Sequence, residues 1–308
     1  MTWRDGVHLT GTPIWCDARR RRDICFVSSA DRIGRTGHGQ LIGTPLTLAL
    51  LGAHGQGHLA VPLRQRFTLG THRLELIPSG RGLGAAALWV DNAGRTVLYA
   101  GPVRTVAGGA GDPAEVRTCD AVVVAAPYGE PHHQFPPLAD VIAQTVEWTH
   151  AQLATDKRPV LFVDTALDGL EVALALAAAG IAISAARPIR EAAVRAAEVM
   201  QLPAIGTPGK EPRAVVWLDA DRLGLARALA DRPHVTALVS ARALERKLTD
   251  AAFPWASAAD RVQLLAWIES TSARDVFLTG AGADAIASVL GPRARVIGPP
   301  HQMALFAP

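Results

Sequence analysis

The pattern of apolar and polar positions divides the chain into a strand-rich first part and a middle part in which strands and helices alternate. Up to about residue 125, short apolar runs broken by Gly, Pro and Asp predict strands. These are Gly11–Cys16, Asp23–Val27, Arg73–Pro78, Ala85–Val90, Thr96–Ala100 and Ala121–Ala125. One helix, Thr44–Leu51, interrupts them, and the turn Asp91–Gly94 predicts a hairpin. Strands in this part are therefore expected to pair in sequence order.

In the middle of the chain, the spacing of the apolar residues changes from that of strands to that of a helix. Leu138–Leu153 has apolar positions at helical spacing. Predicted strands and helices then alternate as Pro159–Asp164, Gly169–Ala179, Ile181–Ala185, Ile189–Met200, Ala214–Leu218, Asp221–Leu229 and Thr236–Ser240. Such alternation predicts parallel strand pairing in an α/β unit. The last part is expected to add helices Ala259–Ser270 and Ala281–Leu290, with strands Asp275–Leu278 and Ala294–Ile297.

Composition is that of a globular protein. The 308 residues are 49% hydrophobic and 19% charged, which suits one large domain or two smaller ones. The formal net charge of +3 is too small to imply nucleic-acid binding by itself.

Cysteine usage and hydropathy indicate a cytoplasmic location. Cys16, Cys25 and Cys119 form no C-x-x-C pair, which argues against a disulfide framework or a thiolate zinc site. The first residues lack the apolar core of a signal peptide. The longest apolar run, Val172–Ile183, is too short to span a bilayer. We therefore expect a cytoplasmic protein without membrane association.

Seven segments carry a resemblance to a known family. The first, Val27–Gly39, reads V-S-S-A-D-R-I-G-R-T-G-H-G. The others are Gly11–Asp17, Pro78–Ala86, Ala100–Arg104, Cys119–Pro131, Trp255–Asp260 and Phe277–Gly280. In order and spacing they resemble the motifs of the ligase-associated DNA exonucleases, bacterial relatives of the mRNA 3′-end processing nucleases. That family reads T-H-A-H-A-D-H-A-R-P-G-H-G in the first segment, so Arg35, Gly37, His38 and Gly39 match it.

The resemblance implies a fold. Members of this family have a four-layer αββα metallo-β-lactamase sandwich, an α/β fold, with an inserted β-CASP domain. For this chain we expect the core at 1–137 and 246–308, and a β-CASP-like α/β insertion at 138–245.

The resemblance also implies that the family's metal site is lost. Its members hold two zinc ions with His and Asp ligands, which activate a water molecule. The corresponding positions here are Ser28, Ala30, Arg32, Ile33, Arg81, Pro102, Ala125, Ala258 and Thr279. A shift of one residue in the first segment gives Ser29, Asp31, Ile33 and Gly34, again without histidine. Such residues do not replace His and Asp as zinc ligands, so no zinc or other cofactor is expected.

Basic residues are candidates for nucleic-acid contacts. Arg19, Arg20, Arg21 and Arg22 form the densest charge run, which is expected either at a solvated hairpin tip or against phosphates. Arg32 and Arg81 occupy former ligand positions and are expected to pair with carboxylates such as Asp31 or Asp260. They would either supply part of the lost cation charge and leave a phosphate-attracting cleft, or simply fill the cavity.

Three histidines and one aspartate are candidates for the cleft itself. His132 and His133 follow a segment that lines the cleft in the family, and Asp260 ends another. His38 matches a family position outside the metal set, where capping of a loop is its simplest role. The pair Gly209-Lys210 faintly resembles a phosphate loop, but Glu211 replaces the required Ser or Thr and a plain loop is expected.

Three classes of function follow. The first is a non-catalytic pseudonuclease that binds DNA or RNA or acts as a scaffold in DNA repair or RNA processing, with an active nuclease, a helicase or a DNA ligase as partner. The second is a metal-dependent exonuclease or other hydrolase with a rebuilt site that uses His132, His133 or Asp260. The third is a protein- or small-molecule-binding module without a nucleic-acid role.

Overall fold

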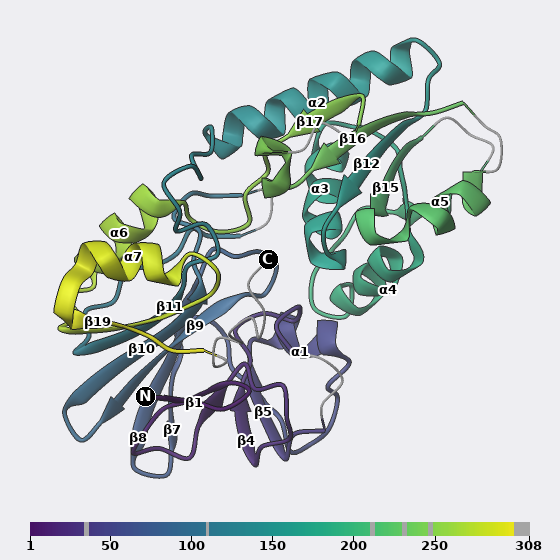
Figure 1. Cartoon of the computed structure of the whole chain (residues 1–308). Coiled ribbons are helices and arrows are strands. Elements are labelled where there is room, and N and C mark those ends of the chain that lie inside the picture. The colour runs from purple at the N-terminus through teal and green to yellow at the C-terminus, as the bar shows by residue number, and fades with distance from the viewer. Residues whose placement is uncertain (34–36, 109–110, 210–212, 230–232, 246–248, 299–308) are drawn as a thin grey trace, which may run out of the picture.

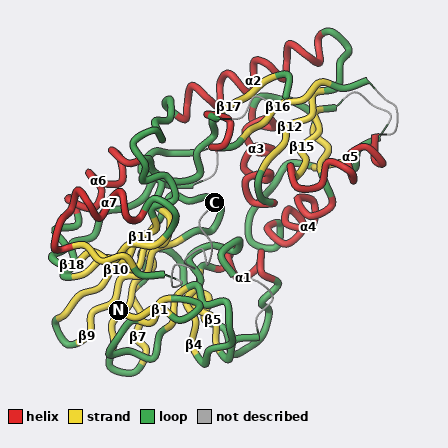
Figure 2. The backbone as a smooth tube through the Cα atoms, viewed as in Figure 1, coloured by secondary structure: helices red, strands yellow, loops and turns green. Residues whose placement is uncertain are grey.

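The computed structural model describes residues 1–33, 37–108, 111–209, 213–229, 233–245 and 249–298. Within these ranges the protein has a mixed α/β architecture with three sheets (Figures 1 and 2). The matched residue Arg35, the alternative ligand position Gly34 and the loop residues Lys210 and Glu211 lie outside the described residues.

The first sheet has six short strands paired in sequence order. They are β1 (Thr2–Trp3), β2 (Val7–His8), β3 (Trp15–Cys16), β4 (Ile24–Phe26), β5 (Gln40–Gly43) and β6 (Leu59–Ala60). β3 and β4 run parallel, so the arginine run between them lies in a crossover loop. The expectation of a hairpin tip at Arg19–Arg22 was therefore wrong.

The second sheet has seven strands in the order β19-β18-β11-β10-β9-β8-β7. They are β7 (Arg66–Leu69), β8 (His72–Pro78), β9 (Ala86–Asn92), β10 (Arg95–Pro102), β11 (Ala121–Ala125), β18 (Asp275–Thr279) and β19 (Ala294–Val296). The predicted hairpin is confirmed: β9 and β10 are antiparallel, and Ala93 and Gly94 between them have φ values of 52° and 86°. Two consecutive left-handed residues are typical of a type I′ turn.

Apolar packing joins the first two sheets face to face. Alternate residues of β4 and β5, such as Phe26 and Ile42, meet Leu76 and Leu88 of the second sheet in one buried cluster. The intervening Cys25 of β4 faces the opposite way, toward helix α1 (Pro45–Leu51). This period of two is that of strands with two buried faces.

Two helices cover the other face of the second sheet. They are α6 (Arg261–Ser270) and α7 (Ala283–Leu290). Trp267 and Ile286 from these helices are buried against Leu98 and Val124 of the sheet.

The third sheet has the strand order β14-β13-β15-β12-β16-β17, and every pairing in it is parallel. Its strands are β12 (Pro159–Val163), β13 (Ile183–Ala185), β14 (Ile205–Gly206), β15 (Ala214–Leu218), β16 (Val235–Val239) and β17 (Ala251–Phe253). Parallel pairing is thus confirmed for the strands predicted here. β17 carries this sheet past residue 245, where the sequence placed the end of the insertion.

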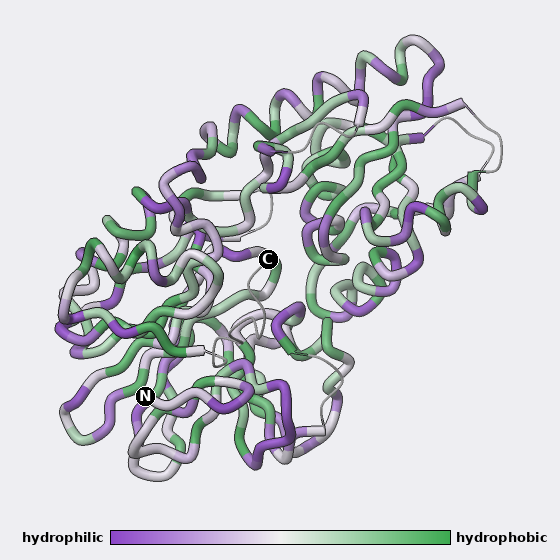
Figure 3. Tube along the Cα trace, viewed as in Figure 1, coloured by the Kyte–Doolittle hydropathy of each residue, from purple (hydrophilic) through white to green (hydrophobic). Residues whose placement is uncertain are grey.

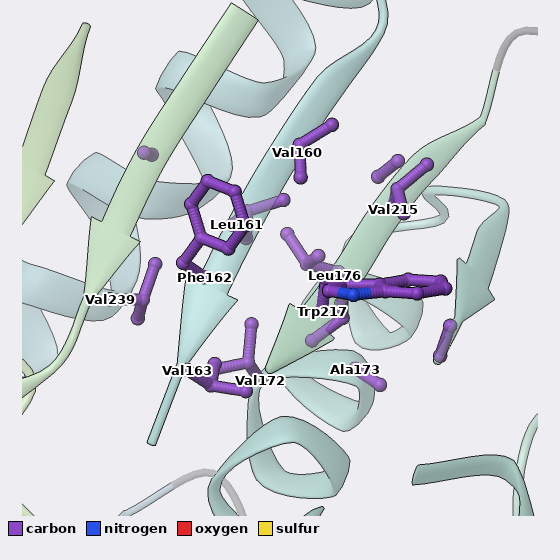
Figure 4. Close-up of a cluster of buried hydrophobic side chains, with 14 of the residues drawn as sticks. Val160, Leu161, Phe162, Val163, Val172, Ala173, Leu176, Val215, Trp217 and Val239 are labelled. Carbon is purple, nitrogen blue, oxygen red and sulfur yellow. The ribbon is translucent and has the colours of Figure 1, made fainter. Parts of the chain in front are cut away.

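Helices α2 (Leu138–Ala154), α3 (Ala166–Ala178), α4 (Arg187–Ala196) and α5 (Arg222–Leu229) surround the third sheet (Figure 1). The described residues also include three short 3₁₀ turns, η1 (Asp219–Asp221), η2 (Ala241–Leu244) and η3 (Gly291–Arg293). Strands β12 and β15 at the centre of this sheet are apolar along most of their length (Figure 3). Figure 4 shows Leu161 and Phe162 of β12 in the cluster that also holds Val172 and Leu176 of α3.

Helix α3 begins three residues earlier than its predicted start at Gly169. Its N-cap is Thr165, whose hydroxyl accepts a hydrogen bond from the Asp168 backbone N–H at 3.1 Å. Gly169 instead lies inside the helix, where a Cβ atom would meet Ile189 Cδ1 at 2.5 Å. The glycine therefore allows α3 and α4 to approach closely.

None of the helices in the described ranges combines the length and the apolar composition needed to cross a membrane.

Candidate functional site

Three of the positions that the resemblance assigns to metal ligands lie side by side at the carboxyl ends of adjacent strands of the second sheet. Pro102, Ala125 and Thr279 end strands β10, β11 and β18, and in the register Pro102 is opposite Ala125 and Ala125 is opposite Thr279. Together with Arg32, which follows β4, they line a cavity of about 280 Å³. The strands run parallel here, so positions far apart in the sequence converge on one site.

A buried carboxylate organises one wall of this cavity. Asp17 follows β3 with a left-handed φ of 47° and lines the cavity. Its oxygens accept hydrogen bonds from the Ser28 backbone N–H at 2.8 Å, from Ser28 Oγ at 2.6 Å and from Tyr99 Oη at 2.8 Å. Burial, together with Asp17, raises the pKa of Tyr99 well above its usual value, so the phenol stays protonated and donates. Ser28, which the resemblance assigns to a metal ligand, is thus a donor to Asp17.

Gly101 permits this close arrangement. It has a left-handed φ of 61°, and a Cβ atom there would lie only 2.8 Å from Ser28 Oγ. Any side chain at this position would push Ser28 away from Asp17.

Arg32 lines the cavity, as does Arg19. The Nε atom of Arg32 lies 3.6 Å from Asp17 Oδ2, and about a third of its side chain remains exposed. Burial acts to lower the pKa of Arg32, but Asp17 and its neighbours raise it above the usual value, so the guanidinium stays charged.

Arg81 is placed differently, between two carboxylates. Its Nη2 atom lies 2.5 Å from Asp31 Oδ2, and its Nη1 atom lies 3.0 Å from Asp168 Oδ1. The side chain is buried, which acts against its charge, yet the two carboxylates raise the pKa of Arg81 above its usual value. The expected pairing with Asp31 is confirmed, whereas Asp168 of α3 was not foreseen. Because two anions surround this one cation, Arg81 fills space and binds α3 rather than offering a free charge.

A second arginine binds the same helix. Arg104, two residues after β10, contacts Glu171 with both terminal nitrogens, at 2.7 Å and 3.1 Å. Both side chains are only 2% exposed. Glu171 lies three residues after Asp168, so both acids project from one face of α3. Sequence reasoning missed this pair because its members are far apart in the chain.

The arginine run reaches the cavity through one member. Arg19 lines it. Arg20 pairs with Asp5 at 2.9 Å in an exposed position, and the Arg22 guanidinium lies 3.8 Å from the centre of the Trp15 ring. Arg21 is exposed to solvent.

Asp260 has a structural role in helix α6. Its side chain accepts a hydrogen bond from the Gln263 backbone N–H at 2.9 Å, within a capping box that begins the helix. Asp260 was also expected to pair with Arg32 or Arg81. The described partner of Arg32 is instead Asp17, and those of Arg81 are Asp31 and Asp168.

The remaining candidates lie away from the cavity wall. Ile33 and Ala258 are buried, and Ala30 is half-buried against an apolar cluster. His38 accepts a hydrogen bond from the Arg22 backbone N–H at 3.2 Å through Nδ1, which braces this loop as expected.

His132 and His133 lie in the loop between β11 and α2. The His133 ring meets Tyr128 edge-on at a centroid distance of 5.4 Å. His132 Nε2 lies 3.2 Å from Glu245 Oε1, a residue that sequence reasoning did not select.

The donor set around the cavity does not suit two zinc ions. The four lining positions that the resemblance assigns to ligands hold Arg, Pro, Ala and Thr, and neither a guanidinium nor an apolar side chain binds zinc as His or Asp does. The nearby carboxylate of Asp17 already accepts three hydrogen bonds. What the cavity can do is bind an anionic group through Arg32.

Comparisons with known proteins give one partial similarity. No protein-family profile matches the chain. A protein of Opitutus terrae described as a probable DNA ligase is 26% identical over 162 residues. The match covers 51% of this chain and 16% of that protein, so the chain spans only a small part of its length.

Proposed function

We propose that this chain is a catalytically inactive relative of the metallo-β-lactamase and β-CASP nucleases. In this proposal it binds nucleic acid, or acts as a scaffold, in DNA repair or RNA processing. The observation that carries the proposal is the convergence of Arg32, Pro102, Ala125 and Thr279 on one cavity. Four positions that the sequence resemblance assigns to metal ligands come together, and none of them carries a zinc-binding side chain.

The order of packed elements supports the proposed fold. Helix α1 packs on the first sheet, the first sheet packs on the second, and α6 and α7 cover the second sheet. This order fits an αββα sandwich. The third sheet and its helices fall between β11 and α6 in the chain, where the resemblance places a β-CASP-like insertion.

The chemistry of the cavity favours binding over hydrolysis. Phosphodiester hydrolysis in the family depends on a metal-activated water, and the former ligand positions supply no ligands for that metal. Arg32 keeps its charge and part of its surface at the cavity, where a guanidinium can hold two phosphate oxygens. The partial similarity to a probable DNA ligase supports a ligase as partner; an active nuclease or a helicase are the other proposed partners.

A metal and activity assay tests the inactive state. Tag-free protein, with and without added Zn²⁺, would be assayed for nuclease activity on single- and double-stranded DNA and RNA. We expect no turnover with any substrate. Turnover that a chelator abolishes would refute the proposal and support the rebuilt hydrolase.

A salt titration of binding tests the role of Arg32. Each phosphate contact contributes roughly 0.7 to 0.9 to the slope of log affinity against log salt. Arg32→Ala should lower this slope by about one contact. The matched control is Arg187→Ala, which removes the same charge from an exposed ion pair on α4. Equal slopes for the parent and both variants would refute the role of Arg32. Failure of the parent to bind nucleic acid at low salt would favour a protein- or small-molecule-binding module.

A further inference from the structure

We propose that His132, His133 and Glu245 form a binding site for one divalent transition-metal ion of the zinc class. The site is separate from the cavity described above, since none of the three residues lines that cavity. The proposal does not depend on the proposed function.

The geometry brings three potential ligand atoms together. One nitrogen from each imidazole and one carboxylate oxygen all lie within 4.8 Å of one another. In a tetrahedral zinc site with bonds of about 2.0–2.1 Å, neighbouring ligand atoms are roughly 3.3 Å apart. His132 Nε2 and Glu245 Oε1 are already 3.2 Å apart. Small side-chain rotations would therefore complete the arrangement.

The local backbone places both imidazoles on one side of the loop. The His133 N–H donates to the Glu130 carbonyl at 3.1 Å, and the Gln134 N–H donates to the His132 carbonyl at 3.0 Å. This turn holds the two ring centroids 4.1 Å apart. Tyr128 supports His133 from the edge.

His133 has a nitrogen that the described residues leave without a partner. Its Nδ1 atom is buried, and no described group forms a hydrogen bond to it. A buried nitrogen without a hydrogen-bond partner suits a metal ligand better than a solvated side chain.

Two imidazoles and one carboxylate select the class of ion. Nitrogen-rich sites of this kind suit Zn²⁺, Ni²⁺ and Cu²⁺, whereas Mg²⁺ and Ca²⁺ prefer oxygen ligands. The bound ion would join the loop before α2 to the end of η2, two segments that are far apart in the sequence. The expectation of no zinc would then hold for the former ligand positions alone.

The test uses the full chain without an affinity tag, stripped with chelator and then titrated with Zn²⁺ or Co²⁺. We expect one ion per chain, a rise in melting temperature, and a visible Co²⁺ absorption band typical of low coordination number. Mg²⁺ at the same concentration should leave the melting temperature unchanged. Titration without saturation at one ion per chain would overturn the proposal.

Substitutions locate the site. His132→Ala and Glu245→Gln should each weaken Zn²⁺ binding by at least about tenfold, because loss of even an indirect partner commonly costs that much. Both residues are exposed, so the fold should be retained, and circular dichroism checks this. The matched control is His150→Ala, an exposed histidine on α2, which should bind like the parent. Equal affinity in the parent and in the His132→Ala, His133→Ala, Glu245→Gln triple variant would overturn the proposal.

Discussion

The buried pair of Arg104 and Glu171 allows a sharp prediction about stability. Glu171→Gln keeps the shape of the side chain and removes its charge, so the Arg104 cation stays buried without its counter-ion. Both side chains are 2% exposed and are joined by two contacts of 2.7 Å and 3.1 Å. Breaking such a pair at one partner typically costs about 3–5 kcal/mol. A Coulomb estimate at 4 Å with an effective dielectric of 20 gives about 4 kcal/mol, in the same range.

Urea denaturation measures this change. With a loss of about 3–5 kcal/mol and a slope of about 1–3 kcal/mol per molar urea, the Glu171→Gln midpoint should fall by about 1–5 M. Replacing both partners, as Arg104→Met with Glu171→Leu, should recover most of the loss, because no charge is then left unpaired. The difference between the stability change of the double variant and the sum of the two single changes gives the interaction free energy of the pair.

An exposed ion pair provides the control. Arg187 and Glu191 on α4 have the same shortest N–O distance of 2.7 Å, but both side chains are largely exposed. Glu191→Gln should therefore change the urea midpoint very little, because solvent screens the pair. If Glu171→Gln lowers the urea midpoint no more than Glu191→Gln does, burial of the charge does not determine how much the Arg104–Glu171 pair stabilises the fold.

Two further predictions concern Arg81 and the thiols. Arg81→Met should lower the free energy of unfolding by about 3–5 kcal/mol near pH 7, because Asp31 and Asp168 lose their shared cation. Burial acts to raise the pKa of Asp31, but Arg81 lowers it below the usual 3.8, so the stabilisation by this ion pair is complete above pH 3.8 and is lost as the pH falls through the folded-state pKa. The difference in urea midpoint between the parent and Arg81→Met should therefore narrow below about pH 4. A difference that stays constant with pH would contradict this reasoning. All three cysteines are buried, and burial raises the pKa of Cys25 to about 12 and of Cys119 to about 11. An aromatic disulfide reagent at pH 8 should therefore label them only after unfolding, and rapid labelling of the native protein would be the opposite result.

Sequence patterns predicted those elements whose signal is local. The strand predicted at Pro159–Asp164 and the helix predicted at Leu138–Leu153 are present as Pro159–Val163 and Leu138–Ala154. Strand β5, Gln40–Gly43, was missed because only two large apolar residues lie between glycines. β1 and β2 are two residues each, and only their pairing with neighbours defines them.

The candidate site was predicted less completely, for a physical reason. Pro102, Ala125 and Thr279, which the motifs selected, lie side by side because each ends a strand and the three strands are neighbours in the sheet. Motif order could not indicate that Asp168 binds Arg81, or that Glu245 meets His132, since these contacts depend on how distant helices and turns pack. The hairpin expected around Arg19–Arg22 failed because two-residue strands carry no signal for their direction.

Arg81 also affects how easily the proposed ancestral metal site could return. On the proposed ancestry, Arg81→His would restore one ligand, but it would remove the cation that Asp31 and Asp168 share. This single substitution would lower the free energy of unfolding, and one restored ligand would not bind a metal ion that could offset the loss. Reversal would need changes at several positions together, so evolution along this path is easier in the direction of loss than in the direction of recovery.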